Sequence, residues 1–218
     1  MASTQKLKLI YKKLYACFGP QHWWPGESAF EVMVGAILTQ NTNWQNVETA
    51  IRNLKQNKAL AFPRLYRLPR KRLASMIRSA GYYNIKAKRL HNYLVFLAEA
   101  YGGNVRRMAV QSKDRLRGQL LQVNGIGPET ADSMLLYALG KPVFVIDAYT
   151  KRIFSRHGLI KDGAGYDEAQ NLFMQNLKNE VKLFNEYHAL LVRLGKDFCL
   201  KNAPRCAACP LKDLEKED

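Results

Sequence analysis

The sequence predicts an all-α protein with roughly ten helices. Over most of the chain, apolar residues recur at the three- and four-residue spacing of one helical face. Glycine and proline pairs interrupt this pattern repeatedly, which marks the ends of helices. Only Pro142–Ile146 has an extended composition, and it fits equally well a buried segment leading into the next helix.

The expected helices follow one another in chain order, each with an apolar face and a breaker behind it. The apolar faces are Leu7, Ile10, Tyr11 and Leu14; Phe30, Val34, Ile37 and Leu38; Val47, Ile51 and Leu54; Leu90, Tyr93, Leu94 and Leu97; Leu172, Phe173 and Leu177; and Leu190, Leu191 and Leu194. The breakers are Gly19-Pro20, Pro25-Gly26, Pro69, Gly81, Gly102-Gly103, Gly125–Pro128 and Gly163–Gly165.

Composition narrows the class of protein. The 218 residues are 47% hydrophobic, enough for a core, and contain no long apolar run or secretory signal, so we expect an intracellular protein without a membrane partner. With 34 Lys and Arg against 18 Asp and Glu, the net charge is +16, which favours a polyanionic partner over a merely solvated basic surface. The basic groups are Lys86, Lys88 and Arg89; Arg106 and Arg107; Lys151 and Arg152; and Lys178 and Lys182.

A glycine turn joins two predicted helices. Leu116–Val123 has helical spacing, Asn124-Gly125-Ile126-Gly127 interrupts it, and Pro128 is suited to be the first residue of the next helix. Backbone N–H groups at such a helix N-terminus attract phosphate. An ordinary helix–turn–helix corner remains the alternative, whereas a dinucleotide-binding turn lacks both the preceding strand and the third glycine.

Asp147 ends the apolar segment and precedes a predicted helix. An aspartate in this position is most often an N-cap. Beside a phosphate-binding turn, the same carboxylate is suited to stabilise positive charge on a sugar and to orient a water molecule.

The three tryptophans lie close together in the sequence, at Trp23, Trp24 and Trp44. They fit a hydrophobic core, but Trp44 follows the polar stretch Thr39–Thr42, which is unusual in a core. Stacked aromatic rings also bind an extruded base, and they favour a cationic one.

Three cysteines crowd the C-terminus as Cys199-x6-Cys206-x2-Cys209-Pro210, a spacing suited to an iron–sulfur cluster or zinc. A four-thiolate site lacks one ligand in this segment. Cys17 is the only other cysteine, and the sequence does not place it relative to the other three.

Taken in order, these segments resemble the helix-hairpin-helix (HhH-GPD) DNA glycosylases of the endonuclease III superfamily from about residue 28 onward. The matching segments are Leu38-Thr39-Gln40-Asn41-Thr42, Gly81-Tyr82-Tyr83-Asn84-Ile85-Lys86-Ala87, Val123-Asn124-Gly125-Ile126-Gly127, Val145-Ile146-Asp147 and His188–Lys196 followed by the cysteines.

The resemblance implies two helical domains flanking a DNA-binding cleft. A six-helix domain spans 29–140 and contains the hairpin at about 116–139; residues 1–28 and 141–218 form the second domain, with a cysteine loop over 199–215. Asp147 matches the catalytic aspartate, and a monomer acting on damaged double-stranded DNA is implied. Gln40 and Asn41, Tyr82, the Gly125-Ile126-Gly127 backbone and Lys151 are the implied DNA contacts.

Two departures from the family pattern change the expected chemistry. The members that cleave the strand carry a lysine where this chain has Glu129, and a glutamate cannot form a Schiff base, so water is the expected nucleophile. The last cluster cysteine would fall at Glu215. A 4Fe–4S cluster held by Cys199, Cys206, Cys209 and an unidentified fourth ligand is expected, with a labile or missing cluster as the alternatives.

Within the family, Trp-Trp-Pro, Trp44 and Glu129 look most like the 3-methyladenine glycosylase (MagIII-type) branch. This predicts a monofunctional N-glycosylase for alkylated purines, with Trp23, Trp24, Trp44 and Lys196 around the base. The alternatives are an endonuclease III-like enzyme for oxidised, deaminated or mismatched bases, a DNA-binding protein without catalysis, and a structural metal protein.

Overall fold

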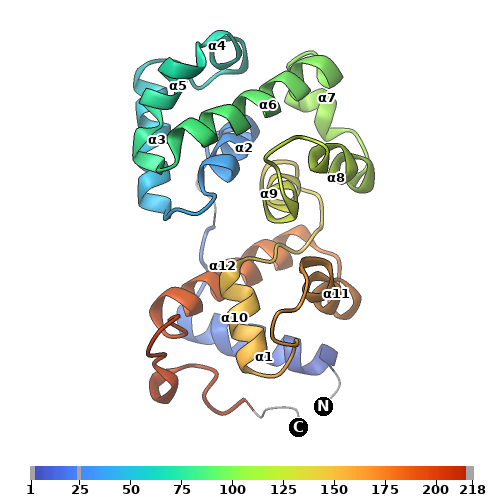
Figure 1. The fold of residues 1–218 in the computed structure, drawn as a ribbon. Coiled ribbons are helices and arrows are strands. Elements are labelled where there is room, and N and C mark those ends of the chain that lie inside the picture. The colour runs from blue at the N-terminus through green and yellow to red at the C-terminus, as the bar shows by residue number, and fades with distance from the viewer. Residues whose placement is uncertain (1–2, 24–25, 215–218) are drawn as a thin grey trace. The chain divides into compact units, whose positions relative to one another are not determined.

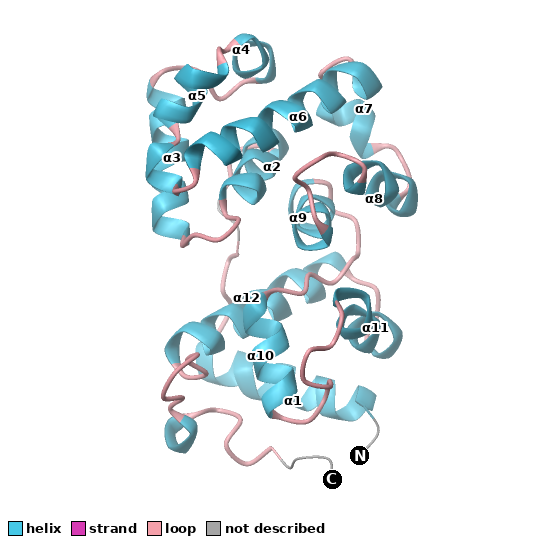
Figure 2. Cartoon of the chain, viewed as in Figure 1, coloured by secondary structure: helices cyan, strands magenta, loops and turns pink. Residues whose placement is uncertain are grey.

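A computed structural model describes residues 3–23 and 26–214, and within these ranges it contains helices and loops but no strand (Figures 1 and 2). The prediction of an all-α fold is confirmed. Contacts divide the chain into two compact units: Met1–Trp23 with Pro142–Asp218, here called the terminal unit, and Trp24–Lys141, the hairpin unit. None of the described helices is long and apolar enough to span a bilayer.

The hairpin unit contains eight α-helices among its described residues. They are α2 (Ala29–Leu38), α3 (Trp44–Gln56), α4 (Phe62–Arg67), α5 (Arg70–Met76), α6 (Tyr83–Tyr101), α7 (Val105–Ala109), α8 (Lys113–Leu121) and α9 (Pro128–Ser133). A 3₁₀ turn, η1 (Arg78–Ala80), precedes α6, and a π-helical turn, η2 (Met134–Ala138), extends α9.

Helices α2 and α6 form the centre of the hairpin unit. Residues 31–38 of α2 are all buried, and the helix begins where Ser28 Oγ accepts a hydrogen bond from the Glu31 amide at 3.2 Å. Helix α6 packs against α2, α4, α5 and α7, as its position in Figure 1 shows. The predicted apolar face of α6 is fully buried from Leu90 to Leu97.

The terminal unit is built on α12 (Val181–Asp197), which packs against α1 (Ser3–Phe18) and α10 (Ala148–Arg156). Helix α11 (Tyr166–Asn176) and the 3₁₀ turn η3 (Cys206–Ala208) complete it. Phe144 stacks on Phe173 with ring centroids 3.8 Å apart, and Tyr187 Oη donates to the Leu7 carbonyl at 2.9 Å. Residues 143–146 are buried without forming a strand, and they lead directly into α10.

Helix boundaries differ from the expected ones where a polar side chain caps the helix. Helix α8 begins at Lys113 instead of Leu116, because Ser112 Oγ accepts from the Arg115 amide at 3.4 Å. The short helices α4 and α7 have no long apolar face, so periodicity did not predict them.

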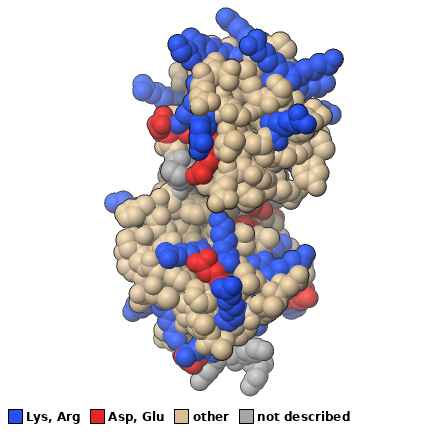
Figure 3. Space-filling view, turned by 90° about the vertical axis from the view of Figure 1, so that its left-hand side faces the viewer, with Lys and Arg blue, Asp and Glu red and all other residues tan. Residues whose placement is uncertain are grey.

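Lys and Arg side chains are spread over the face drawn in Figure 3, where Asp and Glu are fewer. The basic groups read from the sequence nevertheless do not all lie at the surface. Lys86 is only 1% exposed, and the Arg152 guanidinium donates to the carbonyls of Cys199 and Gly195 at 2.8 and 3.0 Å. Lys86 and Arg152 therefore hold backbone carbonyl groups inside the protein, although the sequence analysis counted them among the basic groups that favour a polyanionic partner.

Candidate active site and nucleic-acid interface

Asp147 is the N-cap of α10, and its carboxylate is nearly enclosed. Its side chain is 12% exposed, and Oδ1 accepts a hydrogen bond from the Thr150 amide at 2.7 Å. Burial by itself would raise the pKa of Asp147, but His188 and the hydrogen bonds from Thr150 together lower that pKa below its usual value. The site therefore holds an ionised carboxylate in a largely desolvated position.

His188 on α12 is the nearest basic partner of this carboxylate, with Nε2 3.6 Å from Asp147 Oδ2. At this distance the pair attracts mainly through charge, which requires the protonated imidazole. Trp23 lies edge-on to the His188 ring with centroids 6.4 Å apart. The terminal unit thus brings together Asp147, His188 and Trp23; sequence reasoning had not selected His188.

In the hairpin unit, Gln40 is tied to the glycine turn. Its Nε2 donates to the Gly125 carbonyl at 3.0 Å and to Thr130 Oγ1 at 2.9 Å, and its Oε1 accepts from Arg89 at 2.6 Å. The amide is therefore occupied by the hairpin, and any insertion into a DNA duplex requires these bonds to break. Asn41, the next residue, is exposed with φ 53°.

The turn itself contains two glycines with different surroundings. Gly125 has φ +98°, and a Cβ there would lie 2.3 Å from the Arg89 side chain. A Cβ at Gly127, which caps α9, would meet nothing within 4 Å. Ile126 between them is buried and anchors the turn. The backbone at Gly127 is thus open to close approach from outside, as phosphate binding requires.

The two helices of the hairpin are joined by a buried ion pair. Arg117 of α8 donates from Nε to Asp132 Oδ1 at 2.8 Å and from Nη2 to Oδ2 at 3.3 Å. The Asp132 side chain on α9 is fully buried. This bidentate pair fixes the angle at which the turn is presented.

A buried lysine holds the two loops that carry Gln40 and Tyr82. Lys86 Nζ donates to the Leu38 carbonyl at 2.8 Å and to the Ala80 carbonyl at 2.6 Å. Leu38 ends α2 two residues before Gln40, and Ala80 ends η1 two residues before Tyr82. Tyr82 is 68% exposed and has φ 45°, so its ring projects from a tightly held turn.

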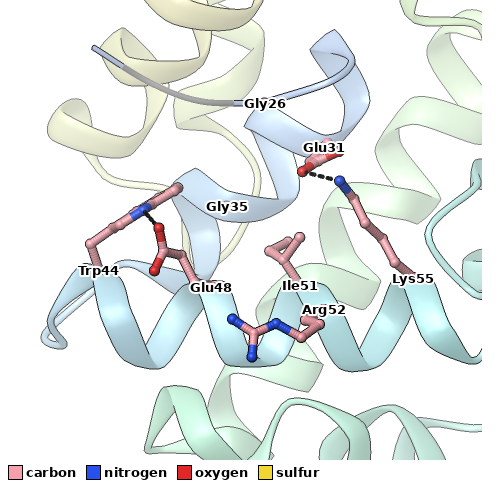
Figure 4. A pocket seen from close by; sticks show the side chains of 8 residues that line it. All are labelled: Gly26, Glu31, Gly35, Trp44, Glu48, Ile51, Arg52 and Lys55. Carbon is pink, nitrogen blue, oxygen red and sulfur yellow. Dashed lines mark hydrogen bonds and ion pairs between the residues drawn. The ribbon is translucent and has the colours of Figure 1, made fainter. Parts of the chain in front are cut away.

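Trp44 begins α3 and lines a cavity of about 340 Å³ between α2 and α3 (Figure 4). Its Nε1 donates to Glu48 Oε1 at 2.7 Å, one turn along the helix. Across the cavity, Lys55 Nζ bridges Glu27 and Glu31 at 2.8 and 2.9 Å. Trp44 is intermediate in burial, and its indole N–H is bound by a carboxylate. These surroundings differ from those of a tryptophan in a hydrophobic core.

Two lysines predicted to contact DNA or the base lie in the terminal unit. Lys151 Nζ donates to the Ala164 carbonyl at 2.8 Å, and Lys196 is exposed in the last turn of α12. Trp24 and Glu215 lie outside the described residues. Trp23 and Lys196 belong to the terminal unit, and Trp44 to the hairpin unit.

The three C-terminal cysteines lie on a loop that two arginines of α10 hold. Arg156 Nη1 is 3.3 Å from Cys199 Sγ and donates to the Leu200 carbonyl at 2.7 Å. Cys199 is buried, Cys206 is exposed and Cys209 is intermediate. Across residues 3–23 and 26–214, no three His, Cys, Asp or Glu side chains are arranged to hold a metal ion.

The chain is similar to known proteins of DNA repair. Residues 34–179 match the family described as HhH-GPD superfamily base excision DNA repair protein. The Methanocaldococcus jannaschii protein "Putative DNA repair glycosylase MJ1434" is 51% identical over 206 residues, which are 94% of this chain and 93% of that protein.

Two solved structures have similar folds. The H. pylori 3-methyladenine DNA glycosylase (MagIII) bound to 1,N6-ethenoadenine is 28% identical, with a TM-score of 0.77 over 90% of this chain and 98% of that one. A non-covalent endonuclease III–DNA complex has a TM-score of 0.84 over 100% of this chain and 97% of that one, at 22% identity, and shows the shared fold.

The chain belongs to the HhH-GPD superfamily of base excision DNA repair proteins, which confirms the resemblance seen in the sequence. Within that class it is a DNA glycosylase similar over nearly its whole length to MJ1434 of Methanocaldococcus jannaschii.

Proposed function

We propose that this glycosylase is monofunctional and removes N-alkylated purines from double-stranded DNA, leaving an intact abasic site. The observation that carries the proposal is the Asp147 carboxylate, which is 12% exposed yet kept ionised by its surroundings. A desolvated negative charge stabilises a developing positive charge more strongly than one in water does. An oxocarbenium-like sugar supplies such a charge as the glycosidic bond breaks.

The proposed reaction balances without a lysine. The bond from C1′ to the base breaks, and its electron pair leaves with the base; water then bonds to C1′ and loses a proton. A purine alkylated at ring nitrogen N3 or N7 is cationic before cleavage and neutral after it, so it needs little acid catalysis. Position 129, in the first turn of α9, is an exposed glutamate that cannot form a Schiff base.

Preference for a cationic base is supported by the surroundings of Trp44. Its indole N–H donates to the Glu48 carboxylate at 2.7 Å, which fixes the ring and places a negative charge beside it. Both effects favour binding of a flat cation against the ring. The structure of H. pylori MagIII holds 1,N6-ethenoadenine, an uncharged modified purine, so it supports the purine class of the substrate and not the charge preference. We include Trp23, Trp24 and Lys196 in the proposed base pocket on the family resemblance.

The DNA contacts are proposed in both units. In the hairpin unit, the Gly125–Gly127 backbone binds a phosphate, and Gln40, Asn41 and Tyr82 approach the site of the extruded base. In the terminal unit, Lys151 contributes a positive charge near Asp147. We further propose that Cys199, Cys206 and Cys209 hold an iron–sulfur cluster, whose role there is structural; thiolates are the ligands that such a cluster requires.

Release of free base from matched duplexes tests this function. Duplexes carrying a methylated purine, uracil or an oxidised pyrimidine at one position are incubated with the protein, and the freed base is measured by chromatography. We expect the methylated purine to be released fastest, at least roughly tenfold over the others. Faster release of the oxidised pyrimidine or uracil would contradict the proposed substrate class.

Replacing Trp44 tests the base pocket. Trp44→Ala is expected to lower the rate of methylated-purine release roughly tenfold or more, because stacking on one aromatic ring is worth about 1–3 kcal/mol. Trp44→Phe keeps a ring and should retain most of the activity. Tyr66→Ala, which removes a partly exposed aromatic of the same unit, is the control. Equal losses in base release and in binding to undamaged duplex would make Trp44 a packing residue.

A further inference from the structure

His188 is a titratable side chain buried in the terminal unit. The side chain is 6% exposed, and the rings of Trp23 and Phe144 both stand edge-on to the imidazole, each with its centroid 6.4 Å away. Phe144 is itself stacked on Phe173 at 3.8 Å, so this contact belongs to the core of the unit. The packing therefore fixes the position of the imidazole beside Asp147.

The two oxygen atoms of the Asp147 carboxylate have different partners. Oδ1 accepts a hydrogen bond from the Thr150 amide at 2.7 Å, at the start of α10. Oδ2 lies 3.6 Å from Nε2 of His188, which belongs to α12. One hydrogen bond leaves a carboxyl group free to rotate, whereas a second partner on another, firmly packed helix fixes its plane. The orientation of Asp147 thus depends on His188 as well as on the helix cap.

His188 also provides the charge that acts on this carboxylate. Burial raises the pKa of Asp147, and among the described residues the positive charge that lowers it is that of His188. From α1, Tyr11 lies edge-on to the ring of Tyr187 at 5.3 Å. The other titratable side chains that neighbouring helices bring to this part of the unit are hydrogen-bonded to backbone groups: Tyr187 of α12, Lys151 of α10 and Tyr166 of α11.

We propose that His188 is a positioning residue for the glycosylase reaction, whose imidazolium keeps the Asp147 carboxylate ionised and fixes the direction of its Oδ2 atom. The inference rests on the role of Asp147 in the proposed function. A carboxylate taken out of water binds a proton more readily unless a positive charge stands beside it. The neutral acid lacks the charge that stabilises an oxocarbenium-like sugar. His188 therefore acts on the reaction through Asp147.

The pH dependence of the His188→Phe variant tests this role, because phenylalanine keeps a ring beside Trp23 and Phe144 but removes the charge. Single-turnover release of the methylated purine is measured from pH 5 to pH 8.5, with release in the absence of protein subtracted. Imidazole is neutral at alkaline pH, so the wild type and the variant then carry equal charge beside Asp147. We expect the variant's rate, relative to the wild type, to be roughly fivefold or more lower at pH 5 than at pH 8.5.

Two further variants accompany this measurement. His188→Gln, which has neither ring nor charge, should show the same trend with pH. His157→Gln removes the histidine that caps the C-terminus of α10 in the same unit, and it should follow the wild type at every pH. A ratio of variant to wild-type rate that stays constant with pH would make His188 a packing residue and overturn the proposal, as would faster excision by His188→Phe at pH 5.

A double-mutant cycle shows whether His188 acts through Asp147. Adding His188→Phe to Asp147→Asn removes a positive charge whose carboxylate is already absent, so we expect less than about a twofold further loss of rate at pH 5. Independent losses in the two single variants would overturn the proposal. Faster release of uracil or an oxidised pyrimidine by the wild type would contradict only the proposed substrate class, and the cycle is then measured with that base.

Discussion

The Asp147→Asn variant is expected to excise an alkylated purine at least about a hundredfold more slowly than the wild type, while its fold and its affinity for duplex DNA are retained. Asparagine caps helices as well as aspartate does, so the hydrogen bond from the Thr150 amide, 2.7 Å in the wild type, has an acceptor in the variant. The substitution removes the charge and little else. Single-turnover release of free base is the measurement.

The control for Asp147→Asn is Asp162→Asn, which removes the same charge from an exposed residue of the terminal unit. It should excise at the wild-type rate. Unchanged excision in Asp147→Asn would show that the carboxylate is only an N-cap.

The pKa of Asp147 also has a consequence for the pH dependence. Because this pKa is lowered, the stabilising interactions of the carboxylate persist above its usual pKa of 3.8 and are lost as the pH falls through the lower folded value. Loss of activity between pH 7 and pH 5 therefore cannot come from protonation of this group.

The Lys86→Met variant is expected to lose roughly 2–4 kcal/mol of unfolding free energy, because two buried carbonyl groups lose their donor. These carbonyls, of Leu38 and Ala80, lie two residues before Gln40 and Tyr82. The variant should therefore also bind damaged duplex less tightly than the wild type. Chemical unfolding and duplex titration measure the two effects. Lys88→Met, which removes an exposed charge from the same helix, should change stability by less than about 0.5 kcal/mol.

The effect of Lys86 has a defined pH dependence. Burial and the neighbouring charge of Arg89 lower the pKa of Lys86 from 10.5 to about 8. Between these two values the unfolded chain binds a proton that the folded chain does not, so the folded state gains stability as the pH rises. The difference in unfolding free energy between wild type and Lys86→Met should therefore grow from pH 8 to pH 10. A difference that stays constant or shrinks over this range would contradict the claim that burial destabilises the charged form of Lys86 in the folded protein.

Helical periodicity was sufficient to predict the fold because most helices bury one face. The apolar face predicted at Leu90, Tyr93 and Leu97 is fully buried in α6. Pro128 is the first residue of α9, a position where the N–H that proline lacks would have no partner within the helix. Short helices such as α4 were not predicted because six residues do not establish a period. The start of α8 was misplaced because a cap, Ser112, and not an apolar residue determines it.

The candidate site was predicted less completely, for a physical reason. Asp147 stands at a helix start, which is a local pattern, but His188 is 41 positions away and meets it only through the packing of α10 on α12. The helical period does contain a signal for the burial of Lys86, which the sequence analysis did not use. Extending the face of Leu90 and Leu94 back by one turn reaches Lys86, which places this lysine in the core and not at the surface. The contact between Phe18, the last residue of α1, and Phe198, which follows α12, joins positions far apart in the chain and has no signature in the sequence.

The central claim is that this chain breaks the glycosidic bond of an alkylated purine with water and leaves the strand intact. Its most direct test uses an end-labelled duplex with a single alkylated adenine, incubated with the protein and divided between samples with and without hot alkali. The account predicts a cleaved product only after alkali, because an abasic site resists cleavage until base is added. Strand cleavage without alkali would show a lyase activity and contradict the role assigned to Glu129, and no product under either condition would contradict the claim itself.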